Sequence, residues 1–146
     1  MALTLKTIDI HNWQACIHLQ LAEDQRSLLA SNLYSLAEAY VQPACQPRGI
    51  YDGSLMIGFA MYLYEAAEGL YWIPRFMIDQ RQQGKGYGRS GMQAVVDEMI
   101  ADRPDTPIMI SITPVNTAAR ALYESLGFED TERRSHGESI LQFTPG

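Results

Sequence analysis

A glycine-rich turn at residues 83–88, with the letters QGKGYG, constrains the fold of this chain more than any other segment. The mostly apolar run 70–78 before it is typical of a strand. Glycines at a strand-to-helix corner let the backbone approach a ligand, and the free N–H groups of the first helical turn attract anions. The turn therefore predicts an α/β fold with a phosphate-binding corner. The helix after it is indicated by apolar residues at helical spacing, namely Met92, Val95, Val96, Met99 and Ile100.

Three other interpretations of this turn fit its residues less well. A P-loop is excluded because Gly86, rather than Ser or Thr, follows Gly84 and Lys85. Residues 86–91 match GxGxxG, but Thr113 and Pro114 follow the next strand, where a dinucleotide site needs an acid for the ribose. A corner with only a structural role is disfavoured by four basic residues around it, Arg75, Arg81, Lys85 and Arg89.

The composition limits the size and the partners of the protein. A length of 146 residues, with 47% hydrophobic and 19% charged residues, predicts a single packed domain over 1–146. The net charge of −6 argues against nucleic acid and against an anionic membrane surface, because both require a basic footprint. The longest apolar run, residues 55–64, is too short to cross a bilayer.

The cysteines and histidines predict neither a disulfide nor a metal site. Cys16 and Cys45 lack CxxC spacing and no leader pattern precedes them, so a cytoplasmic protein with reduced thiols is expected. His11, His18 and His136 show no ligand spacing, which predicts that no metal is bound.

Periodicity and turn residues predict the element order β-α-α-β-β-β-α-β-α-β-β, an α/β domain with a mixed sheet. Pro74 within the strand at 70–78 marks an edge or a bulge. Asn116 is expected to cap a helix that Gly127 closes. The remaining strands are expected at 3–8, 49–51, 55–64, 108–112, 128–134 and 139–143.

Two helices are expected near the N-terminus. Asn12 is expected to cap the first, which should reach Gln20 and Leu21. The second is expected over 32–40. Its apolar positions predict a buried face formed by Leu33, Leu36, Ala37 and Tyr40.

Several motifs together resemble the GNAT superfamily of acyl-CoA-dependent N-acetyltransferases. The turn reads Gln83-x-x-Gly86-x-Gly88, the phrase FMID at 76–79 stands directly before it, and NTAARALYESLGF follows at 116–128. The phrases at 32–39, 58–62 and 75–79 look most like the bacterial spermine/spermidine (diamine) acetyltransferase branch. The resemblance implies a GNAT fold, in which helices flank a mostly antiparallel sheet.

The resemblance also implies acetyl-CoA as cosubstrate and a role for each matching residue. Phe76, Met77 and Ile78 would offer backbone groups to the pantetheine arm as an added strand does. Asn116 would contact the same arm, and Tyr123 would be the general acid that protonates the departing thiolate. The pyrophosphate would be wrapped by Gln83, Gly84, Lys85, Gly86, Tyr87, Gly88 and Arg89.

The acceptor implied by the resemblance is a small-molecule amine, a polyamine such as spermine or spermidine. An alkylamine must lose a proton before it attacks, at a cost of roughly 4.6 kcal/mol at pH 7. Relatives often place an acid on the strand ahead of the bulge, but residues 72–75 here read WIPR. Glu23, Glu38 and Glu65 are therefore candidates to bind the amine or accept its proton, although each could equally be an ordinary solubility charge.

Other functions remain open at this point. The acceptor could be another small amine, an amino acid or a peptide N-terminus, or the chain could be an acyl-CoA-binding sensor without activity. Neither cysteine sits in a recognisable nucleophile setting, so direct attack in a ternary complex is expected rather than an acyl-enzyme. A homodimer is a family-based expectation.

Overall fold

The chain is built around a seven-stranded sheet, as seen over residues 2–26 and 30–146, which the computed structural model describes. The strand order is β1-β2-β3-β4-β5-β7-β6, and only β4 and β5 run parallel. The expected mixed, mostly antiparallel sheet is thus confirmed. The strands are β1 Thr4–Thr7, β2 Gln46–Asp52, β3 Leu55–Glu65, β4 Leu70–Ile78, β5 Ile108–Ile112, β6 Glu129–Ser135 and β7 Glu138–Phe143.

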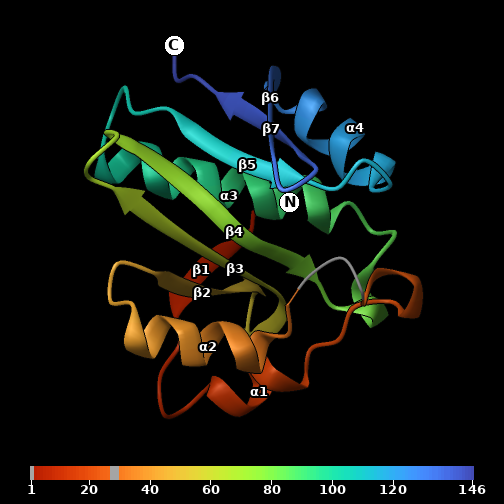
Figure 1. Ribbon diagram of the computed structural model, residues 1–146. Coiled ribbons are helices and arrows are strands. Elements are labelled where there is room, and N and C mark those ends of the chain that lie inside the picture. Colours follow the sequence, from red (N-terminus) through yellow and green to blue (C-terminus); the bar gives the residue numbers. More distant parts are fainter. Residues whose placement is uncertain (1, 27–29) are drawn as a thin grey trace.

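Helices cover both faces of the sheet. Figure 1 shows α1 and α2 beside the strands β1–β3, whereas α3 lies behind the centre of the sheet and α4 beside β6 and β7. The helices are α1 Trp13–His18, α2 Asn32–Val41, α3 Tyr87–Asp102 and α4 Thr117–Ser125, with short 3-10 turns at Glu23–Gln25 and Gln80–Gln82. The element order expected from the sequence is confirmed.

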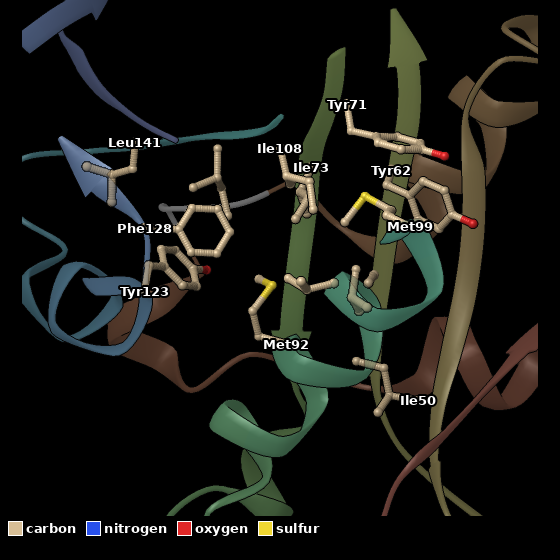
Figure 2. Packing of buried hydrophobic residues seen from close by; sticks show 14 of the residues in the cluster. Ile50, Tyr62, Tyr71, Ile73, Met92, Met99, Ile108, Tyr123, Phe128 and Leu141 are labelled. Atoms are coloured by element: carbon tan, nitrogen blue, oxygen red, sulfur yellow. The ribbon is translucent and has the colours of Figure 1, made fainter. Parts of the chain in front are cut away.

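The larger hydrophobic core lies between the sheet and α3. The apolar face expected for this helix is correct, since Met92, Val95, Val96 and Met99 are all buried in this core. Figure 2 shows Met92 and Met99 against the β4 side of the core, with Tyr123 and Phe128 beside each other nearby. A smaller core on the opposite face holds Cys16, Phe59 and Met77. Residues of β4 are buried in both cores, so the strand is packed on both faces.

The apolar side expected for α2 is confirmed only at Leu36, which is half-buried against the smaller core, and is wrong at the other positions. Leu33 and Tyr40 are 60% and 88% exposed, whereas Asn32 and Ser35 are buried. Polar groups can face the core here because the backbone offers them partners. The Asn32 amide donates to the Cys16 carbonyl over 2.9 Å, and the Ser35 hydroxyl bonds to a carbonyl one turn back.

The first helix is shorter than expected and is not capped by Asn12. The Asn12 side chain instead accepts the N–H of Asp9 over 2.8 Å and donates to the Thr7 carbonyl over 3.0 Å. Gln20 lies beyond the helix end, where its N–H donates to Asp79 over 2.9 Å. These bonds fold the segment after α1 back towards the end of β4.

Candidate active site

The two central strands separate after a short parallel contact. β4 and β5 pair only at Tyr71 with Ile108 and at Trp72 with Met109. Pro74, which has no N–H, follows this contact, and the pairing of β4 with β3 shifts register between Met61 and Leu63 at the same level. The bulge expected at Pro74 is therefore confirmed, and it leaves the β5-facing edge of the second half of β4 without a strand partner among the described residues.

A cleft of about 280 Å³ opens where the strands separate. Most of the cofactor-binding residues expected from the sequence line it, together with the expected general acid Tyr123. Lys85 and Arg89 are the two exceptions. The expected residues that meet in this one cleft are Phe76, Met77, Ile78, Gln83, Gly84, Gly86, Tyr87, Gly88, Asn116 and Tyr123.

The glycine-rich turn leaves donor groups facing the cleft. Gly84 and Gly86 have φ of +79° and +82°, and neither has an atom within 4 Å of a Cβ position. The first N–H that bonds within α3 is that of Ser90, to the Gly86 carbonyl over 3.3 Å. The N–H groups of 87–89 therefore stand before the helical ladder, at the positive end of the helix dipole. This end of the cleft suits a pyrophosphate.

Gln83 fixes the turn to the strand before it. Its side-chain amide donates to the Ile78 carbonyl over 3.0 Å and to the Gln25 side chain over 2.8 Å. Gln25 comes from the segment after α1 and also lines the cleft. Gln83 thus joins three separate segments around the cleft, and these contacts give it a positioning role.

The basic residues around the turn have partners of their own. Arg81 pairs over 2.8 Å with Asp79, whose side chain is buried, and Arg75 pairs over 2.9 Å with Glu38. Lys85 donates to the Gln82 side chain over 3.0 Å, and Arg89 donates to Ser125 over 2.6 Å. Two of the four cations are thus offset by carboxylates, so the backbone of the turn is the more direct source of positive potential.

Asn116 and Tyr123 lie two turns apart on the α4 side of the cleft. The cap expected at Asn116 is confirmed, since its side chain accepts the N–H of Ala119 over 3.2 Å. Tyr123 is 6% exposed and packs against Phe128 with ring centroids 5.8 Å apart (Figure 2). Burial raises the pKa of Tyr123 above its ordinary value, so the hydroxyl stays protonated at neutral pH and is available as a donor.

The three acids expected on the amine side do not line the cleft. Glu23 is exposed in the turn after α1, and Glu38 on α2 is held by Arg75. Glu65 ends β3 at the opposite end of the β3–β4 hairpin from the glycine turn, and it accepts the N–H of Ala67 over 3.2 Å. The structure does not bring these three carboxylates together.

Sequence reasoning missed other residues of the cleft. Ser111, Thr113 and Glu138 line it, as do Leu21 and Gln25 from the segment after α1. The alternation of β5 could have indicated Ser111, because it is the one polar residue between the apolar Ile110 and Ile112. Glu138 carries no such signal, since it reaches the cleft only because β7 pairs with β5.

Comparison with known families decides the relationship of the chain. The acetyltransferase (GNAT) family profile matches residues 9–128. The chain belongs to the GNAT family. It is 30% identical to the spermine/spermidine N(1)-acetyltransferase of Bacillus subtilis strain 168, and 29% identical to a probable spermine N(1)-acetyltransferase of Bacillus subtilis subsp. natto. Each match spans 148 residues and covers 97% of both chains.

Solved acetyltransferase structures share the fold at lower identity. An aminoglycoside acetyltransferase solved with coenzyme A superposes with a TM-score of 0.80 at 21% identity, covering 98% of this chain and 95% of the other. Spermidine N-acetyltransferase from Vibrio cholerae, in complex with CoA and spermine, has a TM-score of 0.75 at 17% identity, covering 96% and 92%. These solved structures support the fold, while the family match and the 30% identical relative make the chain an N-acetyltransferase that uses acetyl-CoA.

The residues present fit this cosubstrate. The β5-facing edge of β4 at Phe76, Met77 and Ile78 has no strand partner in the described part of the chain, so its backbone groups can pair with an extended amide arm. The Thr113 hydroxyl is buried without a hydrogen-bond partner among the described residues and lines the same cleft, so a bound ligand can satisfy it. Over the same residues, no three His, Cys, Asp or Glu side chains gather into a possible metal site, and no helix is long and apolar enough to cross a membrane.

Proposed function

We propose that this GNAT enzyme transfers an acetyl group from acetyl-CoA to a primary amine of a polyamine of the spermine or spermidine kind. The observation that carries the proposal is the 30% identity, over 97% of both chains, to a spermine/spermidine N(1)-acetyltransferase. The cleft supports it, since it offers a pyrophosphate corner at one end and a buried tyrosine beside it.

Backbone groups hold the cosubstrate in this proposal. The unpartnered edge of β4 at Phe76, Met77 and Ile78 pairs with the amides of the pantetheine arm, as a peptide pairs with a sheet edge. Residues 83–89 wrap the pyrophosphate, chiefly through the N–H groups that precede the α3 ladder. Asn116 keeps its cap and offers its amide to the same arm.

The reaction proceeds by direct attack. The neutral amine nitrogen forms a bond to the acetyl carbon, the carbon–sulfur bond breaks, and the Tyr123 hydroxyl gives its proton to the departing thiolate. The acylated nitrogen then loses its surplus proton to water, and the Tyr123 phenolate takes up a proton from water, so the enzyme returns to its starting state. Burial raises the pKa of the Cys16 thiol to about 12, so this cysteine is protonated at neutral pH and is a poor nucleophile for an acyl-enzyme route.

The acids outside the cleft act at longer range. We assign Glu23, Glu38 and Glu65 to the attraction of a polycation rather than to the chemical step, because none of them lines the cleft. The net charge of −6 favours the approach of such a substrate in the same way.

We also propose that the reaction takes place in the cytoplasm, where reduced thiols such as the buried Cys16 and Cys45 are the rule. We expect the enzyme to be a homodimer, which sedimentation would test.

Turnover of acetyl-CoA tests the proposal. Spermine, spermidine, a lysine-containing peptide and an aminoglycoside are compared under identical conditions, and the polyamines are expected to give the highest kcat/KM. Preference for the peptide or the aminoglycoside would overturn the polyamine assignment. Binding of CoA without turnover of any amine would favour a sensor over an enzyme for this chain.

A further inference from the structure

Glu138 is the only charged residue among the described residues that line the cleft. All other side chains in the lining are apolar or uncharged polar. The carboxylate is held in place, because the Ser111 hydroxyl donates to Glu138 Oε1 over 3.0 Å. A lone carboxylate in an otherwise uncharged cleft sets the sign of the ligand group that can lie beside it.

The position of Glu138 separates it from the cofactor corner. It opens β7 directly after the turn at His136 and Gly137, and the next residue, Ser139, pairs with Ile112 at the end of β5. Ile110 and Ile112 belong to the core on the α3 side, so Ser111 between them points to the opposite face of the sheet. Because Ser111 contacts it, Glu138 lies on that opposite face as well.

In the described part of the chain, a polar group without a hydrogen-bond partner also lines the cleft near the end of β5. Thr113, which follows Ile112, has a buried hydroxyl without a hydrogen-bond partner among the described residues, and it lines the same cleft. A bound molecule that passes the end of β5 therefore meets an anionic oxygen and a hydroxyl that has not yet formed a bond. Such a pair suits a group with several N–H donors.

The protonation state of each nitrogen of a polyamine decides whether that nitrogen can lie beside Glu138. An ordinary carboxylate is a weaker base than an alkylamine by about a million-fold, so it holds an ammonium group rather than deprotonating it. The attacking nitrogen of a polyamine must be neutral, whereas its other nitrogens stay protonated. A carboxylate on the acceptor face is therefore suited to a nitrogen that does not react.

We propose that Glu138, oriented by Ser111, binds a protonated, non-reacting amine of the acceptor and so selects polyamines over monoamines. This inference rests on the proposed polyamine function and names the residue that gives it specificity. Glu138 has no other charged side chain beside it in the described part of the cleft lining, so the ammonium group would be its only ionic partner there. The acceptor would then lie on the face of the sheet opposite α3.

Calorimetry with spermidine and with n-butylamine tests this assignment on the protein saturated with CoA. The variant Glu138→Gln removes the charge and keeps the shape, and Glu129→Gln makes the same change at an exposed position of β6 in the same hairpin. Spermidine affinity is expected to fall about ten- to hundredfold in Glu138→Gln alone. Butylamine affinity is expected to be the same in all three proteins, and Glu138→Asp should recover most of the spermidine affinity.

The outcomes separate the two proposals. Unchanged spermidine affinity in Glu138→Gln, or an equal loss for butylamine, would overturn the role of Glu138 and leave polyamine acetylation standing. A wild-type protein that neither binds nor acetylates any polyamine would overturn the proposed function, and this inference with it. Acetyl-CoA affinity and thermal unfolding, measured in parallel, should match between Glu138→Gln and Glu129→Gln, which shows that the cofactor corner and the fold are intact.

Discussion

The two sides of the cleft are built in different ways. The proposed cofactor side consists mainly of a strand edge, a glycine turn and a helix N-terminus from the continuous segment 70–102, which act through backbone groups, and the cap of α4 adds the Asn116 side chain. The proposed acceptor side is assembled from side chains of β5 and β7, with Ser111 bonded to Glu138. In these two proposals the cosubstrate is recognised by backbone groups, which almost any side chain can accompany, whereas the acceptor is selected by particular side chains such as Glu138.

The largest effect is expected at Tyr123, the buried tyrosine that lines the cleft. Tyr123→Phe removes the proposed proton donor and leaves the ring that packs on Phe128. We expect kcat to fall by about a hundredfold or more while the Kd of acetyl-CoA stays within twofold. Tyr40→Phe, at a side chain 88% exposed on α2, is the matched control and should leave kcat unchanged. Normal turnover in Tyr123→Phe would remove this residue from the chemical step.

A second experiment breaks the cofactor side alone. Gly86→Ala adds a side chain at a φ of +82°, and Gly53→Ala does the same at +62° in the β2–β3 turn. Both variants should lose about 1 kcal/mol of unfolding free energy, because an L residue is strained there. Only Gly86→Ala should weaken acetyl-CoA binding, by roughly tenfold, as the donor groups of the turn shift. Equal acetyl-CoA affinity in both variants, measured by calorimetry, would show that the turn does not bind the phosphates.

This contrast explains what the sequence could predict. Turn residues, caps and apolar spacing are local signals, so the hairpins, α3, β5 and the Asn116 cap agree with the structure. Most of the expected cofactor-binding residues could be predicted for the same reason, because they lie close together in the sequence between residues 76 and 89. The acceptor side depends on which strands pair, and no local letter indicates that Glu138 reaches Ser111 across 27 residues.

The errors near the N-terminus have the same physical origin. Apolar spacing assigned Leu33 and Tyr40 to the interior, but the partner of α2 is a surface that offers backbone carbonyls. Asn32 and Ser35 satisfy those groups and are buried instead. Apolar periodicity reflects only the spacing of residues within one helix. It carries no information about the backbone groups of the packing surface, which need hydrogen-bond partners.

A third experiment tests whether two acids outside the cleft, Glu38 and Glu65, contribute to the stability of the fold. Glu38→Gln removes the carboxylate that pairs with Arg75, whose side chain is only 15% exposed, whereas Glu65 makes no ion pair among the described residues. Urea unfolding should show a loss of roughly 1–3 kcal/mol in Glu38→Gln and under 0.5 kcal/mol in Glu65→Gln. Similar stabilities for the two variants would show that the Arg75 pair contributes little to the fold.

The smallest effect concerns the attraction of a polycation by acids outside the cleft. In the variant that combines Glu38→Gln and Glu65→Gln, we expect the KM for spermidine to rise about two- to threefold at low salt, with the KM for acetyl-CoA unchanged. The difference should disappear near 0.5 M salt, because screening removes long-range charge effects. The variant is assayed at a temperature where circular dichroism shows it fully folded, so that the lost Arg75 pair does not contribute. A parallel rise for both substrates would mean that the acidic surface serves solubility alone, and would leave Glu138 as the charge that distinguishes the acceptor.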